Sequence, residues 1–221
     1  MKLGLLERKE SWCLTLRGWI AVIAGMVGLA FLSAHGVFPF LAPTHRIGGD
    51  FLVVEGWLPD YALADLRQEF DQGGFKLLVI TGSPILKGEA LTEHKNLADL
   101  TKAILLKAGW PNDKLVAVPS AEVLKDRTYA AALALKEWLD RSKTPARSLT
   151  LYSGGAHARR SWLLYRMALG SQTQVGIIAS RDLRYDGKRW WRTSEGVRDI
   201  LNESIAYVYA KILFLRPHQA P

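Results

Sequence analysis

The residues best suited to chemistry lie at positions 153–160, which read Ser-Gly-Gly-Ala-His-Ala-Arg-Arg. Gly154 and Gly155 let the backbone approach a ligand closely, and free N–H groups at the start of a helix bind anions. His157 and Arg160 are three residues apart and share one side of such a helix. Together with Ser153 they predict a phosphate or carboxylate site in which His157 gives or accepts a proton. A serine N-cap, a glycine turn and a surface histidine explain the same residues equally well.

Two other segments carry polar residues directly after apolar runs. Glu55 ends the first run, where its carboxylate can act as a base, bind a substrate hydroxyl or simply be solvated. Thr81, Gly82 and Ser83 follow the second run and form a hydroxyl-bearing turn. This turn predicts hydrogen bonds to an anion, although an ordinary turn before a helix has the same composition.

Asp126, Arg127 and Thr128 open a further amphipathic segment. Asp126 suits an N-cap position, which is the simplest interpretation. Alternatively, Arg127 reaches an anion across a cleft while Thr128 donates a hydrogen bond to it. The five histidines show no metal-ligand spacing and no glycine-rich nucleotide motif is present. We therefore expect no metal site, and the sequence identifies no cofactor.

These segments are positioned by an alternation of short apolar runs and amphipathic stretches. The predicted strands are 51–54, 76–81, 114–118, 148–152 and 174–179, and the predicted helices are 61–70, 92–108, 126–139, 156–169 and 191–213. This order predicts an α/β fold: a Rossmann-like, doubly wound, mainly parallel sheet of about five strands. In such sheets ligands bind beyond the carboxyl ends of the strands, where all of the segments above lie.

An apolar stretch precedes this domain. Residues 18–42 contain no Asp, Glu, Lys or Arg, and about 20 such residues cross a bilayer as a helix. Four basic residues precede the stretch and one follows it closely: Lys2, Arg8, Lys9, Arg17 and Arg46. The positive-inside rule then places the N-terminus in the cytoplasm. A cleaved signal peptide fits less well, because Leu32 stands where a small residue is expected before cleavage after Ala34.

The predicted organisation is therefore a cytoplasmic tail at 1–17, a transmembrane helix at 18–42, a linker at 43–49, an extracytoplasmic domain at 50–216 and a tail at 217–221. The helix would hold the protein in the inner (plasma) membrane, with the domain in the periplasm or its equivalent. Small residues four apart within the helix, such as Ala21 and Gly25, also allow a homo-oligomer.

The net charge of +8 suggests an anionic partner. Part of this charge flanks the apolar stretch and so reports topology, and an extracytoplasmic domain does not meet nucleic acid, which we therefore exclude as a partner. The segment 181–192 is basic and contains Trp190 and Trp191. It can contact lipid headgroups or a polyanionic glycan, or form a solvated loop before the last helix. The single cysteine, Cys13, excludes a disulfide framework.

Five short motifs occur in the order expected for one known family. They are 53–56 (Val-Val-Glu-Gly), 80–83 (Ile-Thr-Gly-Ser), 126–132 (Asp-Arg-Thr-Tyr-Ala-Ala-Ala), 151–160 and 202–206 (Asn-Glu-Ser-Ile-Ala). In this order the chain resembles the SanA/ElyC/YdcF-like family of envelope-associated proteins. The resemblance implies a Rossmann-like domain behind one N-terminal span, linked to envelope integrity and peptidoglycan precursor metabolism. Among the family's site residues, those that the resemblance assigns most directly in this chain are His157 and Arg160.

Two hypotheses follow. In the first, the domain acts on an anionic envelope precursor such as a lipid-linked or sugar phosphate. Arg127 and Arg160 would bind the anion, the backbone of 153–156 would cradle it, and His157 with Glu55 would handle protons. In the second, the domain is a non-catalytic binding or scaffold module of the envelope.

Overall fold

The computed structural model describes residues 12–86, 92–142 and 146–213, so the predicted tail at 217–221 and most of the tail at 1–17 lie outside the described residues. The chain divides between Gly36 and Val37 into two compact units. The first consists mainly of α1, which runs from Leu16 to Leu41 and enters the second unit with its last turn. Within the described residues, α1 is the one helix long and apolar enough to cross a membrane. The predicted apolar helix at 18–42 is therefore present.

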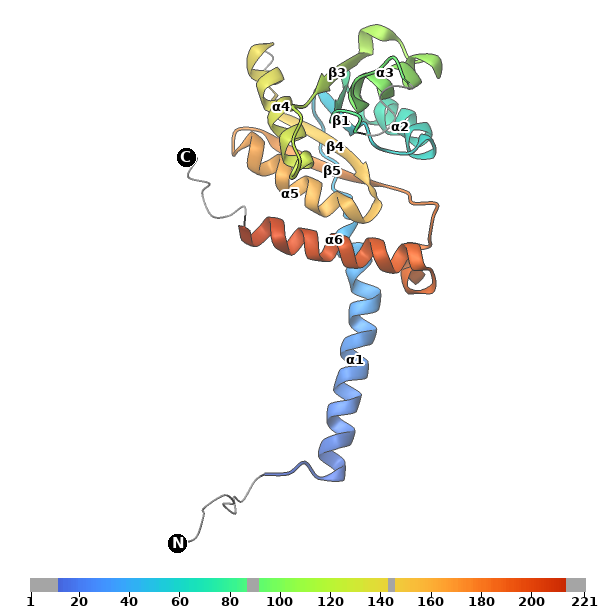
Figure 1. Ribbon diagram of the computed structural model, residues 1–221, viewed down its shortest axis with the longest axis vertical. Helices are drawn as coiled ribbons and strands as arrows, with labels where there is room; N and C mark the ends of the chain where they lie inside the picture. Colours follow the sequence, from blue (N-terminus) through green and yellow to red (C-terminus); the bar gives the residue numbers. More distant parts are fainter. Residues whose placement is uncertain (1–11, 87–91, 143–145, 214–221) are drawn as a thin grey trace. The chain divides into compact units, whose positions relative to one another are not determined.

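The second unit is built on one sheet, in which every pair of neighbouring strands is parallel (Figure 1). The strands are β1 (Phe51–Glu55), β2 (Leu77–Gly82), β3 (Leu115–Pro119), β4 (Ser148–Gly154) and β5 (Gln174–Ser180), in the order β3-β2-β1-β4-β5. Their apolar runs are buried because helices cover both faces of the sheet. The predicted α/β class with a parallel, Rossmann-like sheet is confirmed.

The two faces of the sheet carry different helices. The helices α2 (Asp60–Gly73) and α3 (Leu97–Lys107) pack on the face to which β1 sends Leu52 and Val54. The helices α4 (Arg127–Arg141) and α5 (Ala158–Leu169) pack on the face that receives Phe51 and Val53. The remaining elements of the described residues are three 3-10 turns and a final helix: η2 (Asn112–Lys114), η3 (Gly155–His157), η4 (Gly187–Arg192) and α6 (Ser194–Leu213).

The strand order creates a crevice between β1 and β4. From β1 the chain winds outward to β2 and β3, then returns to the other side of β1 for β4 and β5. Since β1 and β4 are where the winding direction reverses, the loops that follow them diverge above the sheet. The register pairs Val54 with Tyr152, so the next residues along the two strands, Glu55 and Ser153, lie side by side at the opening.

The compact unit begins earlier than Asp50, where the sequence analysis places its start. Leu41 is buried with Ala156 and Ile200. The backbone of His45 forms an antiparallel bridge with Ile177 of β5, with N···O distances of 2.7 and 2.9 Å. Residues 43–49 are therefore part of the folded unit and not a free linker.

Gly82 sets how closely β2 approaches α3. A Cβ atom added at Gly82 would lie 2.3 Å from the backbone nitrogen of Ala98. We expect Gly82→Ala to lower the free energy of unfolding by about 2 kcal/mol, because the helix start must shift. Gly48→Ala is the matched control, since its added Cβ meets nothing within 4 Å. Denaturant unfolding of the detergent-solubilised protein measures both variants, and equal losses at the two positions would contradict the packing argument.

Candidate functional site

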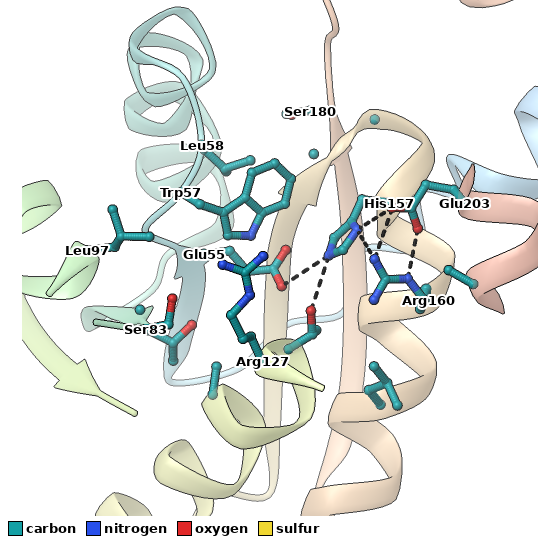
Figure 2. A pocket seen from close by; sticks show the side chains of 18 of the residues that line it. Glu55, Trp57, Leu58, Ser83, Leu97, Arg127, His157, Arg160, Ser180 and Glu203 are labelled. Carbon is teal, nitrogen blue, oxygen red and sulfur yellow. Dashed lines mark hydrogen bonds and ion pairs between the residues drawn. The ribbon is translucent and has the colours of Figure 1, made fainter. Parts of the chain in front are cut away.

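A pocket of about 830 Å³ opens above the carboxyl ends of the strands (Figure 2). It is lined by the ends of β1, β2 and β4, by the start of α4 and by one side of α6. Every predicted site residue except Ser153 lines it: Glu55, Thr81, Gly82, Ser83, Asp126, Arg127, Thr128, Gly154, Gly155, His157 and Arg160. The structure therefore brings the separate sequence segments into one cavity.

Glu55 forms the floor of the pocket. Its side chain is only 3% exposed, and its carboxylate accepts hydrogen bonds from the hydroxyls of Ser153 and Ser161. A buried carboxylate needs such donors, because it has lost its hydration. Ser153 is fully buried behind Glu55, so its side chain supports the carboxylate instead of facing a ligand. The sequence does not predict this role for Ser161, since it does not reveal which side of α5 faces the sheet.

His157 lies between two carboxylates. Its Nδ1 is 3.0 Å from Oε1 of Glu203, and its Nε2 is 3.8 Å from Oε1 of Glu55. The hydroxyl of Thr128 is 3.5 Å from the same Nε2. The ring of Trp57 meets the imidazole edge-on, with centroids 4.9 Å apart. The imidazole is thus held with one nitrogen toward α6 and the other toward the pocket and a hydroxyl.

Glu203 of α6 joins His157 to Arg160. The Arg160 guanidinium donates two hydrogen bonds to it, with Nε–Oε2 at 2.8 Å and Nη2–Oε1 at 3.0 Å. Burial opposes ionisation of Glu203, but the hydrogen bonds and charges of His157 and Arg160 outweigh burial and lower the pKa of Glu203 to about 2. Glu203 therefore neutralises much of the Arg160 charge, which the sequence analysis assigns to a bound anion.

The cations around the pocket divide into paired and unpaired groups. Arg184 lies 2.5 Å from Asp182 and 3.3 Å from Asp199, and Arg181 binds Asp65 outside the pocket. Lys125 and Arg127 are both exposed, and the side chain of neither forms an ion pair or hydrogen bond with a described residue. The guanidinium of Arg127 points into the cavity toward Glu55 and Trp57 (Figure 2). The unbalanced positive charge is therefore at the start of α4.

Asp126 adopts an unusual backbone conformation at the same place. Its φ of 58° and ψ of 34° are left-handed, and it is the only non-glycine residue at positive φ in the described parts of the chain. Asp126 occupies the N-cap position of α4, as its place before the helix predicts, but its side chain accepts no hydrogen bond from the helix. The first N–H groups of this 15-residue helix consequently face the pocket without a side-chain acceptor from Asp126.

The end of β2 and the residue that follows it, Ser83, lie at the pocket with different exposures. Thr81 is 1% exposed, and its hydroxyl is 2.7 Å from that of Tyr165. Burial and the charge of Glu55 raise the pKa of Tyr165, which keeps this pair neutral. Ser83 is half-buried and lines the pocket, while its carbonyl accepts a hydrogen bond from the Leu97 N–H at 2.9 Å. Of the two predicted hydroxyls here, Ser83 is thus the one placed to reach a ligand.

The arrangement can support proton transfer beside the exposed guanidinium of Arg127. The hydroxyl of Thr128, the imidazole of His157 and the carboxylate of Glu203 lie in a row, each within contact of the next. Glu203 can therefore orient the ring while Nε2 exchanges a proton. No group of three His, Cys, Asp or Glu residues that could hold a metal ion occurs in the described part of the chain.

Glu203 was given no role in the sequence analysis, although it stands in one of the five short motifs. A glutamate in a final helix gives no sign of partners 43 and 46 residues earlier in the chain.

A scan against models of known protein families finds no match, and a search of curated proteins also finds none. The resemblance to the SanA/ElyC/YdcF-like family therefore stays a prediction that depends on the short motifs in this sequence. The function is inferred from the geometry of the pocket.

Proposed function

We propose that this protein is a membrane-anchored domain whose pocket binds an anionic precursor of the cell envelope, such as a lipid-linked or sugar phosphate, and acts on it through His157. The observation that carries the proposal is the unpaired positive charge of Arg127 and Lys125 at the pocket entrance. The other pocket arginines already have carboxylate partners.

Three features at the start of α4 favour a phosphate. Arg127 supplies a guanidinium, which binds phosphate oxygens through two parallel N–H donors. The first N–H groups of α4 add donors and the positive end of the helix dipole. Thr128 adds a hydroxyl that already lies beside His157. A phosphoryl group bound here would be next to the imidazole.

The acid–base step falls to His157 and Glu55. His157 Nε2 faces the cavity, and Glu203 holds the opposite side of the ring. Glu55 keeps a carboxylate within 3.8 Å of Nε2, where it stabilises the imidazolium formed when His157 accepts a proton. His157 and Glu55 together suit the transfer of a phosphoryl or glycosyl group from a leaving oxygen to an attacking hydroxyl, with His157 taking the hydroxyl proton.

The envelope assignment comes from α1 and from the family resemblance. A helix of this length and apolarity can anchor the domain. The basic residues before it support a domain outside the cytoplasm, where it would meet envelope precursors and not nucleic acid.

A non-catalytic binding or scaffold module is the second candidate. One observation favours it: Arg160 and Glu203 satisfy each other through two hydrogen bonds, as expected for a structural ion pair. In that case the Arg127 side of the pocket still binds the anion, and His157 only supports the pocket wall.

Anion binding is tested by replacing Arg127. We expect Arg127→Ala to weaken binding of inorganic pyrophosphate, and of a polyprenyl-phosphate sugar, by roughly ten- to a hundredfold, the value of one charge-assisted hydrogen-bonded contact. Arg141→Ala is the matched control, because Arg141 is an exposed arginine at the other end of α4. Titration calorimetry in nanodiscs measures both variants. Unchanged affinity in Arg127→Ala would remove the basis of the proposal.

A further inference from the structure

The last helix, α6, presents a row of exposed apolar side chains. Leu201, Ile205, Val208 and Ile212 are 52, 68, 51 and 57% exposed. Their spacing of four, three and four residues places them on one side of a helix. Four exposed aliphatic side chains in line on one helix form an apolar patch, and such patches on a protein surface mark sites of interaction with another protein or a membrane. We call these four residues the α6 stripe.

The other sides of α6 are already occupied. Ile200 is buried with Leu41 and Ala156, and Glu203 binds His157 and Arg160 in the pocket. At about 100° per residue, the α6 stripe lies about 80–140° around the helix from Ile200. The orientation of the stripe relative to the domain is therefore fixed by two sets of contacts, and the stripe faces away from both.

The end of the apolar helix α1 lies against α6. The rings of Phe40 and Tyr207 meet edge-on with centroids 5.4 Å apart. Arg159 donates a hydrogen bond to the Phe40 carbonyl at 2.6 Å and lies over the Phe40 ring at 4.3 Å. Because Phe40 lies in the last turn of the apolar helix, the part of α6 around Tyr207 lies close to the point where that helix would leave a bilayer.

The segment before α6 has the composition of a membrane interface. η4 reads Gly-Lys-Arg-Trp-Trp-Arg, and its Lys188, Arg189 and Arg192 are exposed. Trp191 is 38% exposed. Tryptophan is enriched at headgroup level, and lysine and arginine near the surface are attracted to anionic lipids.

We propose that α6 lies in the boundary between headgroups and acyl chains of the membrane that α1 crosses, with the α6 stripe in contact with lipid. This rests on the proposed anchoring by α1. Lipid fits the stripe better than a second copy of the chain does. The row is narrow and is bordered by Arg198, Asn202 and the exposed ring of Tyr209, whereas a stable protein interface covers about 800 Å² on each partner. A narrow apolar row with basic and tryptophan neighbours is typical of interfacial helices.

The test uses nitroxide labels on the full chain. Cys13 is the only cysteine, so a Cys13→Ser background accepts one label at a time. Labels at Ile205→Cys and Val208→Cys report the stripe, and Asn202→Cys reports an exposed polar position about 60–120° around the same helix from these two. Val27→Cys reports the middle of α1. The protein is placed in nanodiscs of phosphatidylethanolamine and phosphatidylglycerol, and each label is exposed to oxygen, which dissolves in lipid, and to a water-soluble nickel chelate.

We expect the labels at 205 and 208 to resemble the label at 27, with a several-fold higher ratio of oxygen to nickel accessibility than the label at 202. If 205 and 208 match 202 while 27 stays in lipid, the inference about α6 is overturned and the anchoring stands. If 27 is also open to nickel, the anchoring itself fails and takes the inference with it. Dipolar broadening at 205, combined with protection from both reagents, would identify a second copy as the occupant and overturn the lipid assignment.

Discussion

Replacing Glu203 with glutamine is expected to lower the free energy of unfolding by about 3 kcal/mol at neutral pH, and by almost nothing near pH 2. The carboxyl has an ordinary pKa of 4.5 and a folded-state pKa of about 2. Burial works against this lowering, and the hydrogen bonds and charges of His157 and Arg160 produce it. Each unit of pKa difference corresponds to about 1.4 kcal/mol, which gives the expected size.

The direction of the pH dependence follows from the lowered pKa. The unfolded chain binds a proton at Glu203 more readily than the folded chain does, so the stabilisation is complete above about pH 4.5 and is lost as the pH falls toward 2. Urea unfolding of wild type and Glu203→Gln across this range measures the difference. Glu137→Gln is the control, because Glu137 is an exposed glutamate with an arginine 3.8 Å away. A difference for Glu203→Gln that did not change with pH would show that its effect is one of packing.

Replacing His157 with glutamine separates the two functional hypotheses. If the domain is an enzyme, loss of the imidazole is expected to reduce turnover by roughly 10²- to 10⁴-fold, the usual contribution of a general acid–base, while ligand affinity changes little. Release of sugar phosphate (cleavage of the P–O–P bond) or of free sugar (cleavage of the glycosidic bond) from a polyprenyl-pyrophosphate sugar measures the turnover, and calorimetry measures the affinity.

The comparison with Arg127→Ala makes the result specific. In the catalytic hypothesis His157→Gln impairs the reaction and Arg127→Ala impairs binding. In the scaffold hypothesis the wild type turns nothing over, and His157→Gln binds as well as the wild type does. Turnover that survived in His157→Gln would reject His157 as the proton carrier and leave Glu55 as the remaining candidate on the pocket floor.

The fold could be predicted because burial on both faces gives parallel strands their continuous apolar runs, as in Phe51–Glu55. The sequence also predicts which residues share the site, because the carboxyl ends of parallel strands lie at one edge of the sheet. Glu55 and His157 follow two such strands and therefore lie close together. The first and last residues of the helices and strands were harder to predict from the sequence. The helix predicted at 92–108 starts instead at Leu97, because the Asn96 side chain accepts a hydrogen bond from the Asp99 N–H and caps it there.

The features of the site that the sequence does not predict depend mainly on contacts between distant segments. Glu203 reaches the pocket only because α6 packs beside η3 and α5. The role of Ser161 depends on which side of α5 faces β1. The left-handed backbone of Asp126 has no sequence signature beyond the tolerance of aspartate for it. Each of these features changes the chemistry assigned to a predicted residue, while the pocket still lies at the carboxyl ends of the strands, where the sequence predicts it.

The early start of the compact unit has a consequence for the proposed binding of a lipid-carried ligand. The compact unit begins at Val37, inside the apolar helix, and the backbone of His45 is bound to β5, so residues 43–49 belong to the same unit as the pocket. If α1 anchors the protein as proposed, the pocket is tethered to the membrane. In a membrane, the pocket and a lipid-carried ligand would then diffuse in one plane. Their encounters would depend on surface density, as for tethered partners with a high effective concentration. A modest affinity measured in detergent would accordingly correspond to high occupancy in the membrane, and a soluble analogue would gain nothing from the anchor.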